Sequence, residues 1–457
     1  MINKINLPKA VIEILNLLDS YGSVGYVVGG CVRDSIIDRP IHDWDICTPV
    51  VISEVQALFE EEGYKVIPTG IKHGTVTVMI DDVGYEITTF RRDGEYTDGR
   101  HPDNVEFTSN LVEDLSRRDF TMNAIAYNPA VGFIDPFEGL KDIENHTIRC
   151  VGYARDRFKE DALRILRMWR FECQLGFSTE PGTQNAAVHG INERLLENIS
   201  KERIQSEFVK AIMSQKSNFT TRPQFFLKSI IPEWKDMIHF PQNNPYHVYT
   251  VDFHSMIAYS MVKDNSDLIL RLAVLFHDIG KPHCYQDGSD GIRHFKGHAK
   301  VSAEMTEQIL RRLKFDNYTI DNVVELIRYH DATFNVGGKY VKRWLNKIGK
   351  EQFKRLLELR KADIKAQNPK YIDDRLDKIR EIEMILENIL KEEQCFSIKD
   401  LAINGKDVMK WACIKEGKDV GIWLNRLLKL VIDGDLPNDK DTLIYYIVGT
   451  TDGWMKP

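Results

Sequence analysis

Two kinds of periodicity divide the chain. Residues 7–20 carry apolar side chains every three or four positions, which predicts an amphipathic helix packed on the core. Residues 74–80 and 83–90 alternate apolar and polar side chains, as paired strands joined by a tight turn do. Residues 53–62 predict a further helix with Ser53 at its N-cap. From residue 149 the helical pattern continues almost to the end. We therefore predict an α+β fold, with a mixed sheet first and helical domains after it.

A short apolar run at residues 26–28 precedes Gly29 and Gly30, and a helical pattern follows. Glycines at such a turn let the backbone approach a phosphate, and the free N–H groups of a helix start point at it. Asp43 and Asp45 lie two residues apart, so on a strand both carboxylates would leave from one face. Paired carboxylates suit Mg²⁺. A solvated edge strand is the alternative, but the preceding strand, glycines and helix favour a metal-dependent nucleotidyltransferase.

The segment Gly29-Gly30-x-Val32-Arg33-Asp34, followed by Asp43-x-Asp45, resembles the signature of class II tRNA nucleotidyltransferases and bacterial poly(A) polymerases. The resemblance extends over nearly the whole chain. It implies a small polymerase-β-like head followed by all-α neck, HD and tail domains. The implied bounds are 1–145 for the head, 146–240 for a neck that selects the nucleotide and binds RNA, 241–368 for the HD domain, and 369–457 for a tRNA-binding tail.

A third acid, Glu86, lies in an apolar strand run, where an unpaired carboxylate is costly to bury. Spacing alone allows an outward-facing position equally well. The family has an acidic residue just before its T-T-F-R element, here residues 88–91, so the resemblance implies that Glu86 joins Asp43 and Asp45 as a catalytic carboxylate. It also implies that a complete polar loop at residues 91–103 supports addition of the terminal adenosine.

Arginines dominate the remaining head motif, Arg117-Arg118-Asp119-Phe120-Thr121-x-Asn123-Ala124, which resembles the family's R-R-D-F-T-x-N-A. Guanidinium pairs form forked bonds to a triphosphate, although surface ion pairs are the alternative for any one arginine. The implied nucleotide-binding residues are Gly29, Gly30, Arg33, Arg117, Arg118, Asp119, Asn123, Asp161, Arg164, Arg167 and Arg170.

Asp161 and Arg164 lie three residues apart in a predicted long helix that begins at Glu160, so they would project from one face. A surface ion pair is the common outcome of this spacing. A carboxylate beside a guanidinium also complements the amine donor and ring-nitrogen acceptor that cytosine and adenine share, and it mismatches uracil and guanine. The family's E-D-x-x-R motif, which these residues resemble, is assigned that selecting role.

Histidines concentrate in one region: seven of the thirteen lie between His247 and His330. A lone histidine on an apolar helix is usually a core residue, but several with aspartates more plausibly bind metal. The set looks like an HD-type metal-dependent phosphohydrolase domain, in which some relatives carry phosphatase or 2′,3′-cyclic phosphodiesterase activity. A purely structural metal is the alternative. The implied ligands are His254, His277, Asp278 and Asp363 for one ion, with His298 and His330 as candidates for a second.

Composition limits the function classes. The chain has 457 residues, 43% hydrophobic and 28% charged, and no apolar run approaches the roughly 20 residues that span a bilayer. Seven scattered cysteines form no disulfide framework, and together with the absence of a signal-peptide pattern they fit a cytoplasmic protein. The net charge of −7 counts against an RNA partner. This argument is weak, because phosphate is bound by local basic patches and not by the total charge.

The resulting hypothesis is template-independent addition of CCA to tRNA from CTP and ATP, with Mg²⁺ in the head and Mg²⁺ or a divalent transition metal in the HD domain. Neither DNA nor a membrane is an expected partner, and the sequence does not indicate an oligomeric state. Two rivals stay open. One is an A-adding enzyme or poly(A) polymerase with the same chemistry, and the other is an HD phosphohydrolase whose head only binds RNA.

Overall fold

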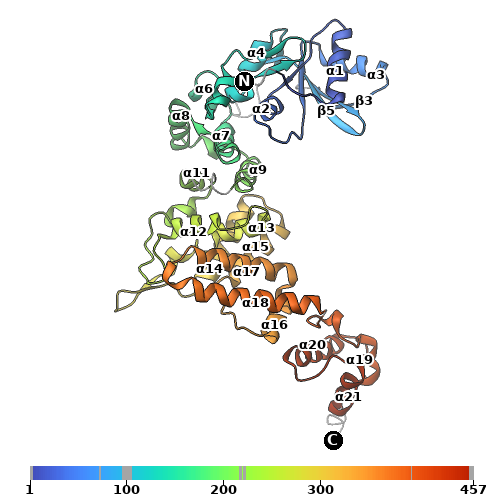
Figure 1. The fold of residues 1–457 in the computed structure, drawn as a ribbon, viewed down its shortest axis with the longest axis vertical. Helices are drawn as coiled ribbons and strands as arrows, with labels where there is room; N and C mark the ends of the chain where they lie inside the picture. The colour runs from blue at the N-terminus through green and yellow to red at the C-terminus, as the bar shows by residue number, and fades with distance from the viewer. Residues whose placement is uncertain are drawn as a thin grey trace. The chain divides into compact units, whose positions relative to one another are not determined.

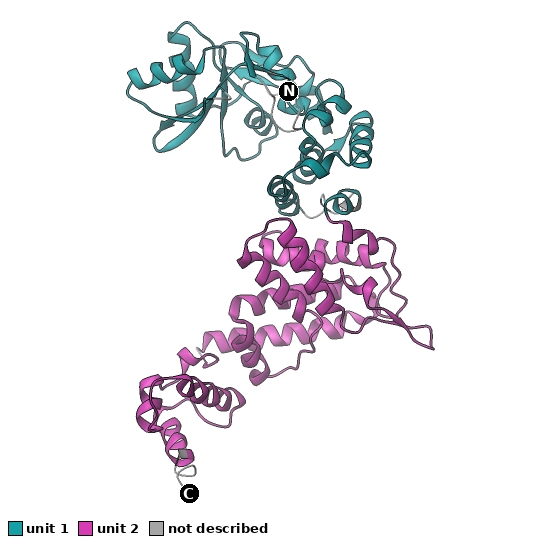
Figure 2. Ribbon diagram, turned by 180° about the vertical axis from the view of Figure 1, so that it is seen from behind, with its two compact units in different colours: residues 1–230 teal, residues 231–457 magenta. Residues whose placement is uncertain are grey.

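The computed structural model describes residues 4–71, 74–94, 105–215, 219, 223–392 and 394–451. The chain divides into two compact units, residues 1–230 and 231–457 (Figure 2). Unit 1 contains a mixed sheet and helices, whereas unit 2 is almost entirely helical (Figure 1), so the predicted α+β fold is confirmed. The predicted four domains are a finer division and stay a prediction. No helix in the described ranges is long and apolar enough to cross a membrane.

The sheet of unit 1 has the strand order β3-β4-β5-β2-β1-β8-β9. Its neighbouring strands are antiparallel except β2 and β5, which are parallel. In that order the strands span Lys65–Gly70, Thr75–Ile80, Val83–Thr89, Asp45–Thr48, Tyr26–Val28, Ala126–Asn128 and Gly132–Ile134. The predicted strand pair is confirmed. Its turn holds Asp81 and Asp82 at φ +50° and +62°, the twist that suits a two-residue hairpin.

Helices pack on this sheet as the apolar periodicity predicted. The helix α1 (Lys9–Ser20) buries the apolar side of its pattern, α2 (Gly30–Ile36) packs on β1, and α3 (Ile52–Glu61) packs on β3 and β4. The predicted cap is wrong, because α3 is preceded by Val51 and Ser53 lies inside its first turn. The helices α4 (Leu111–Ser116) and α5 (Gly139–Glu144) complete this part.

The loop expected at residues 91–103 begins with a strand. The strand β6 (Arg91–Asp93) pairs antiparallel with β7 (Val105–Phe107), apart from the larger sheet. Residues 95–104 lie outside the described residues. The inference that a complete loop at residues 91–103 supports addition of the terminal adenosine therefore stays a prediction.

The helical part of unit 1 begins with a break that the sequence did not predict. The predicted long helix is present but begins at Leu163 and not at Glu160: the preceding helix ends at Glu160, and Asp161 is extended at φ −140° between the two. The carboxylate Oδ1 of Asp161 accepts the N–H of Leu163 at 3.0 Å and so caps the second helix. The helices here are α6 (Ala154–Glu160), α7 (Leu163–Leu175), α8 (Pro181–Asn192), α9 (Lys201–Ile212) and α11 (Pro223–Ile230).

Unit 2 is built around α13 (Leu268–Phe276), in which every residue from Ile269 onward is buried. A helix that is buried on all sides belongs in the middle of a bundle, and the one charged residue of α13, Arg271, donates to the carbonyls of Asp264 and Ser266. The side chain of Asp267 caps it by accepting the N–H of Leu270 at 3.0 Å. Around it pack α12 (Val251–Ser260), α15 (Asn317–Tyr329) and α17 (Lys350–Lys365), and α14 (His298–Arg312) packs on α15 (Figure 1).

The rest of unit 2 follows the same helical pattern. It comprises α16 (Gly338–Ile348), α18 (Asp373–Lys391), α19 (Gly405–Trp411), α20 (Lys418–Asp433) and α21 (Lys440–Thr451). The last three share an apolar core of their own, with Val408, Leu427 and Ile447 almost fully buried. Two short strands, β12 (Gln286–Asp287) and β13 (Arg293–His294), form a hairpin between η5 (Lys281–His283) and α14.

Candidate active site and metal centre

The turn between β1 and α2 requires glycine at its first position. Gly29 has φ +85°, a left-handed conformation that residues with a Cβ rarely adopt. A Cβ at this position would also lie 2.8 Å from Nη1 of Arg118 and 3.8 Å from Oδ2 of Asp45. The backbone therefore approaches the charged side chains more closely than any other residue would allow, as a phosphate-binding turn requires.

The three predicted carboxylates lie on or near two parallel strands. Asp45 opens β2, but Asp43 precedes the strand, so the expectation that both project from one strand is only half right. Asp45 is in register with Glu86 on β5. Burial raises the pKa of Asp45 above its usual value; Arg118 opposes this shift, and the carboxylates of Glu86 and Asp43 add to it. A divalent cation would relieve this repulsion, so the donors fit Mg²⁺.

The three acids are not tightly clustered. Glu86 is exposed, and Asp43, Asp45 and Glu86, all described residues, do not form a group whose ligand atoms lie within 4.8 Å of one another. Asp43 and Asp45 do line a common cleft, whereas Glu86 does not. The cleft thus supports the aspartate pair more strongly than the third acid.

That cleft has a volume of about 600 Å³ and gathers charged side chains from β2, α2, α7 and α9 and from the segment that follows α4. All eleven residues that the sequence predicted for nucleotide binding line it. Its lining contains seven arginines and four aspartates, so a chain with a net charge of −7 has a cationic cleft. An excess of guanidinium groups in a concave site suits a polyanion such as a triphosphate.

A chain of hydrogen bonds fixes one side of the cleft. Nη1 of Arg33 donates to Oδ1 of Asn123 at 2.6 Å, and Nδ2 of Asn123 donates to Oδ1 of Asp119 at 3.0 Å. Both Nε and Nη2 of Arg167 donate to Oδ2 of Asp119, at 2.7 and 2.5 Å. Burial alone would raise the pKa of Asp119, but Arg167 and the bond from Asn123 lower it well below its usual range. The carboxylate stays ionised and holds two elements of the cleft together.

The Arg117–Arg118 pair is oriented by an acid beneath it. Arg117 donates to Oδ1 of the fully buried Asp114 at 2.8 Å, and Nη2 of Arg118 lies 3.6 Å from its Oδ2. Because one carboxylate contacts both guanidinium groups, two cations lie side by side next to the Gly29 turn.

Asp161 and Arg164 both line the cleft, and each of these side chains contacts another partner, so the surface ion pair that their spacing also allowed is not seen among the described residues. Nη2 of Arg203 contacts Oδ2 of Asp161 at 2.7 Å. Arg164 instead donates to Oε2 of Glu160 at 2.7 Å and to the carbonyl oxygen of Arg117 at 2.9 Å. This follows from the helix break at Asp161, which removes the i, i+3 relation of the two side chains.

Sequence reasoning missed four residues that line the cleft, among them Arg203, Phe171 and Gln174. The ring of Phe171 lies under the guanidinium carbons of Arg33 and Arg170, at 4.9 and 4.1 Å from its centroid. The signal for two of them was present, because Phe171 and Gln174 follow Arg167 at four and seven positions and share its helix face. Arg203 comes from α9, and spacing within α7 carries no information about it.

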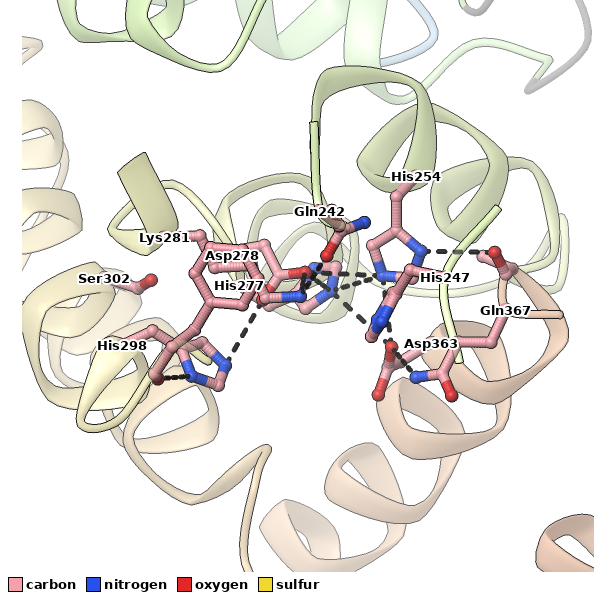
Figure 3. A network of polar contacts seen from close by, with 12 residues as sticks. Gln242, His247, His254, His277, Asp278, Lys281, His298, Ser302, Asp363 and Gln367 are labelled. Carbon is pink, nitrogen blue, oxygen red and sulfur yellow. Dashed lines mark hydrogen bonds and ion pairs between the residues drawn. The ribbon is translucent and has the colours of Figure 1, made fainter. Parts of the chain in front are cut away.

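A second cluster lies within unit 2, where six predicted metal ligands converge from separate segments (Figure 3). His254 is on α12, His277 and Asp278 follow α13, and His298 opens α14. His330 caps the end of α15 and Asp363 is on α17. All six side chains are at most 8% exposed. The helix bundle thus assembles residues that are up to 109 positions apart in the sequence.

The first half of this cluster consists of His254, His277, Asp363 and one oxygen of Asp278. The two imidazole Nε2 atoms lie 3.2 Å apart, and Nε2 of His254 is 3.1 Å from Oδ1 of Asp363 and 3.4 Å from Oδ2 of Asp278. The Nδ1 atoms of the two histidines donate to the backbone carbonyls of Ala366 and Val274. Each Nε2 therefore presents a lone pair to the other, an arrangement that a bound cation makes favourable.

The second half repeats this pattern around the other oxygen of Asp278. Nε2 of His298 and Nε2 of His330 lie 3.0 Å apart, at 3.4 and 3.7 Å from Oδ1 of Asp278. Their Nδ1 atoms donate to the carbonyls of Phe295 and Ile327. Neither buried oxygen of Asp278 accepts a hydrogen bond from the described residues. The donor set fits two divalent cations that share Asp278.

One cation of the protein already contacts this centre. Nζ of Lys281, which is 4% exposed, lies 2.7 Å from Oδ2 of Asp278 and donates to Oε1 of Gln242 at 2.8 Å. Sequence reasoning missed Lys281 and Gln242.

Comparison with known families matches both units. Residues 25–149 match the Poly A polymerase head domain, and residues 286–447 match tRNA nucleotidyltransferase domain 2. The CCA-adding enzyme of Ligilactobacillus salivarius is 33% identical over 448 residues, 96% of each chain, and that of Lactobacillus helveticus is 34% identical over 459 residues, 98% of this chain and 99% of its own. That of Lactobacillus delbrueckii is 50% identical over 204 residues, so the chain spans about half the length of the relatives it matches at this higher identity.

Solved structures show the same architecture. The CCA-adding enzyme of Bacillus stearothermophilus in complex with CTP has a TM-score of 0.68 and 27% identity, and the match covers 97% of both chains. The CCA-adding enzyme of Thermotoga maritima complexed with tRNA has a TM-score of 0.60 at 21% identity, a likeness that concerns the fold alone.

Proposed function

The chain belongs to the family of CCA-adding enzymes, and we propose that it adds CCA to the 3′ end of tRNA from CTP and ATP without a nucleic-acid template. In the reaction, the tRNA 3′-oxygen bonds to the α-phosphorus of the nucleotide, the bond from that phosphorus to the β-phosphate oxygen breaks, and pyrophosphate leaves. The near-full-length relatives and the structural neighbour in complex with CTP support this assignment.

The cationic cleft of unit 1 is the observation that carries the proposal. It places the Gly29 turn, the Asp43 and Asp45 carboxylates and seven arginines around one volume. A nucleoside triphosphate needs each of these: backbone access for its phosphates, carboxylates for its metal ions and guanidinium groups for its charge.

The residues of the cleft divide the work by position. Arg117 and Arg118 bind the triphosphate next to the glycine turn, and Arg33 contacts phosphate or ribose. Asp43 and Asp45, with Glu86, would hold Mg²⁺, which would supply Lewis-acid activation of the 3′-hydroxyl and charge neutralisation for the triphosphate. Most of the catalysis then comes from positioning and charge neutralisation.

Nucleotide choice rests on Asp161 and Arg164. Both side chains line the cleft, so a base can meet a carboxylate and a guanidinium there. To read the base directly, Asp161 must share its oxygen with Arg203, which contacts it at 2.7 Å. We therefore place Arg203 beside the selecting carboxylate, where it orients Asp161 toward the base.

The decisive experiment separates CCA addition from the A-adding and poly(A) rivals. Purified protein is offered tRNA that ends before the CCA sequence, or one base short of the terminal adenosine, with CTP and ATP supplied separately. Incorporation of C into the shorter tRNA and of A into the longer one is expected. Failure to use CTP on the shorter tRNA would exclude CCA addition and support an A-adding enzyme.

A second function is favoured by the buried histidine cluster. Nε2 of His254 lies 3.2 Å from Nε2 of His277, and Nε2 of His298 lies 3.0 Å from Nε2 of His330. One pair lies beside each oxygen of Asp278, which together is a donor set for two divalent cations. Two such ions can activate water and hold a phosphoryl group, so we assign this centre hydrolysis of a phosphomonoester or a 2′,3′-cyclic phosphate in an HD-type domain. We propose the same four domains as above: a head at residues 1–145, a neck at 146–240, the HD domain at 241–368 and a tail at 369–457. We also propose that the protein works in a reducing cytoplasm, which its seven free thiols support.

Hydrolysis is tested with 2′,3′-cyclic nucleotides and 4-nitrophenyl phosphate in the presence of Mg²⁺, Mn²⁺, Co²⁺ or Ni²⁺. Phosphate release that depends on the metal and disappears in His277→Ala is expected, with nucleotide incorporation retained. If no metal supports release from any of these substrates, the centre is a structural metal site.

A further inference from the structure

A fifth histidine, His247, faces the ion-binding cluster from a segment without regular structure. A ligand atom of His247 lies within 4.8 Å of ligand atoms of both His254 and Asp363. Its ring centroid is 5.1 Å from that of His254, and Figure 3 shows it beside Asp363. The resemblance that predicted the other six ligands did not indicate this residue.

The hydrogen bonds of Asn244 fix which nitrogen of His247 is available. Oδ1 of Asn244 accepts the backbone N–H of Tyr246 at 3.1 Å, and Nδ2 donates to the carbonyl of Gln242 at 3.2 Å, so the orientation of the amide is determined. Nδ1 of His247 lies 2.9 Å from the same Oδ1 and must donate to it. Nε2 is therefore the lone-pair nitrogen, as in the four histidines of the cluster.

The segment that carries His247 is held at both sides. The backbone N–H of Arg293 donates to the carbonyl of Asn243 at 2.9 Å. On the other side, Asn368 donates its backbone N–H to Tyr246 at 2.8 Å and its Nδ2 to the carbonyl of Pro245 at 2.9 Å. Asp363 lies in the last turn of α17, and Asn368 follows the end of that helix by three residues, so the anchor of the segment and a metal ligand are close in the chain. The position of His247 relative to Asp363 is thereby fixed.

We propose that His247 is a further ligand of the ion that His254 and Asp363 bind, and that Asn244 is its positioning residue. This inference rests on the proposed metal centre. With His247 the available donors at this ion become three imidazole nitrogens, from His247, His254 and His277, and carboxylate oxygens from Asp278 and Asp363. Such a nitrogen-rich set selects a divalent transition metal such as Mn²⁺, Co²⁺, Ni²⁺ or Zn²⁺ over Mg²⁺, which prefers oxygen.

The test is a titration of the metal-stripped full-length chain with Co²⁺, followed by calorimetry and by the visible spectrum of the bound ion. The titrated proteins carry Asp43→Asn and Asp45→Asn, so that the cleft of unit 1 does not contribute. His247→Ala is expected to weaken one of two binding steps by about 100-fold, and Asn244→Ala to weaken the same step by about tenfold. Loss of a nitrogen ligand also shifts the Co²⁺ absorption bands, which a purely structural role of His247 would leave in place.

Matched variants control for folding. His294 is an exposed histidine on β13 of the same unit, and His294→Ala is expected to bind Co²⁺ as the parent does. Asn244→Asp keeps the acceptor for Nδ1 and is expected to restore most of the affinity that Asn244→Ala loses. In the chain with Asp43 and Asp45 intact, His247→Ala should retain nucleotide incorporation, which shows that the fold persists.

The outcomes separate the two proposals. If the parent binds two Co²⁺ ions and His247→Ala binds both with unchanged affinity and spectrum, His247 is not a ligand and only this inference is wrong. If the parent binds no Co²⁺ and His254→Ala is indistinguishable from it, the metal centre itself is wrong and the inference is overturned with it. Tighter binding of Mg²⁺ than of Co²⁺ by the parent would contradict the selectivity.

Discussion

The cleft of unit 1 and the histidine cluster of unit 2 solve opposite electrostatic problems. The cleft collects seven arginines, and carboxylates such as Asp114 and Asp119 hold several of them in place. The cluster collects imidazole lone pairs and two aspartates in a site that is almost fully buried. The side chains of the cleft are held in place by other protein groups, without a ligand. In the cluster, pairs of imidazole Nε2 atoms lie about 3 Å apart, so their lone pairs face one another. The side chains of one site suit an anion, and those of the other suit cations.

The two sites differ in what holds their side chains in place. In the cleft, bidentate ion pairs within the protein fix the guanidinium groups, so the site is formed without substrate. In the cluster, backbone carbonyls fix the imidazole rings through Nδ1, so that the Nε2 atoms crowd around Asp278, whose Oδ2 also contacts Nζ of Lys281. Ligand removal should therefore affect stability at the cluster far more than at the cleft.

Replacing both Asp43 and Asp45 by asparagine is expected to give the largest effect. Without these carboxylates the cleft loses its metal ligands, and nucleotide incorporation should fall by at least about 1,000-fold. The measurement is incorporation of radiolabelled CTP into tRNA that lacks CCA. Binding of Co²⁺ by unit 2 should stay at the parent's level, and incorporation that persists in the double variant would show that the carboxylates are misassigned.

The converse variant is Asp278→Asn. Both ions share this carboxylate, so its replacement should abolish metal-dependent phosphate release and weaken both Co²⁺ binding steps by about 100-fold or more. Incorporation of CTP and ATP should change less than twofold, because Asp278 lies outside the cleft. A parallel loss of both activities would mean that the two sites are coupled and would break the comparison drawn here.

Removal of metal ions is expected to destabilise unit 2 selectively. Ions that bind only the folded state at a concentration of 100 times the dissociation constant stabilise by about 2.7 kcal/mol, so chelation should lower the thermal midpoint of the cluster's unfolding transition. Calorimetry with and without chelator measures it, and Asp278→Asn supplies the control that should show no shift. An identical shift in that variant would place the stabilising ion elsewhere.

The smallest effect on nucleotide incorporation is expected for Gly29→Ala, and Gly63→Ala is its matched control. The two glycines have φ +85° and +86°, but a Cβ at Gly63 meets nothing within 4 Å whereas one at Gly29 meets Arg118. Both variants should lose about 1 kcal/mol of unfolding free energy through backbone strain. Only Gly29→Ala should lower nucleotide incorporation, by about tenfold, because its Cβ displaces the guanidinium. Equal activity of the two variants would show that the close approach is unimportant.

Much of the cleft could be anticipated from local motifs. Gly29, Gly30 and the Arg117–Arg118 pair occupy contiguous segments, and a strand–turn–helix reading of those segments needs no distant information. Asp161 and Arg164 contact other partners because the helix begins at Leu163 and not at Glu160, and the Asp161 side chain accepts the N–H of Leu163 instead of standing on the helix face. Whether a helix continues through such a residue depends on a local competition that periodicity does not resolve.

The histidine cluster shows the same limit at longer range. Its six predicted ligands were found because the resemblance supplied them together, but spacing offered no reason to add His247 or Lys281. His247 joins the cluster through a loop held by Asn368 and Arg293, which lie 121 and 46 residues further along the chain. Contacts of this separation are absent from any local window.

The sequence by itself determined the helices and strands with strong periodicity, the glycine turn and the kinds of side chain available for phosphate and metal. The tertiary structure decided which of them meet: Arg203 rather than Arg164 beside Asp161, and Asp278 between two pairs of imidazoles. The physical reason is that periodicity encodes which face of an element is apolar, whereas the partner of a charged side chain is set by the packing of elements that are distant in the chain.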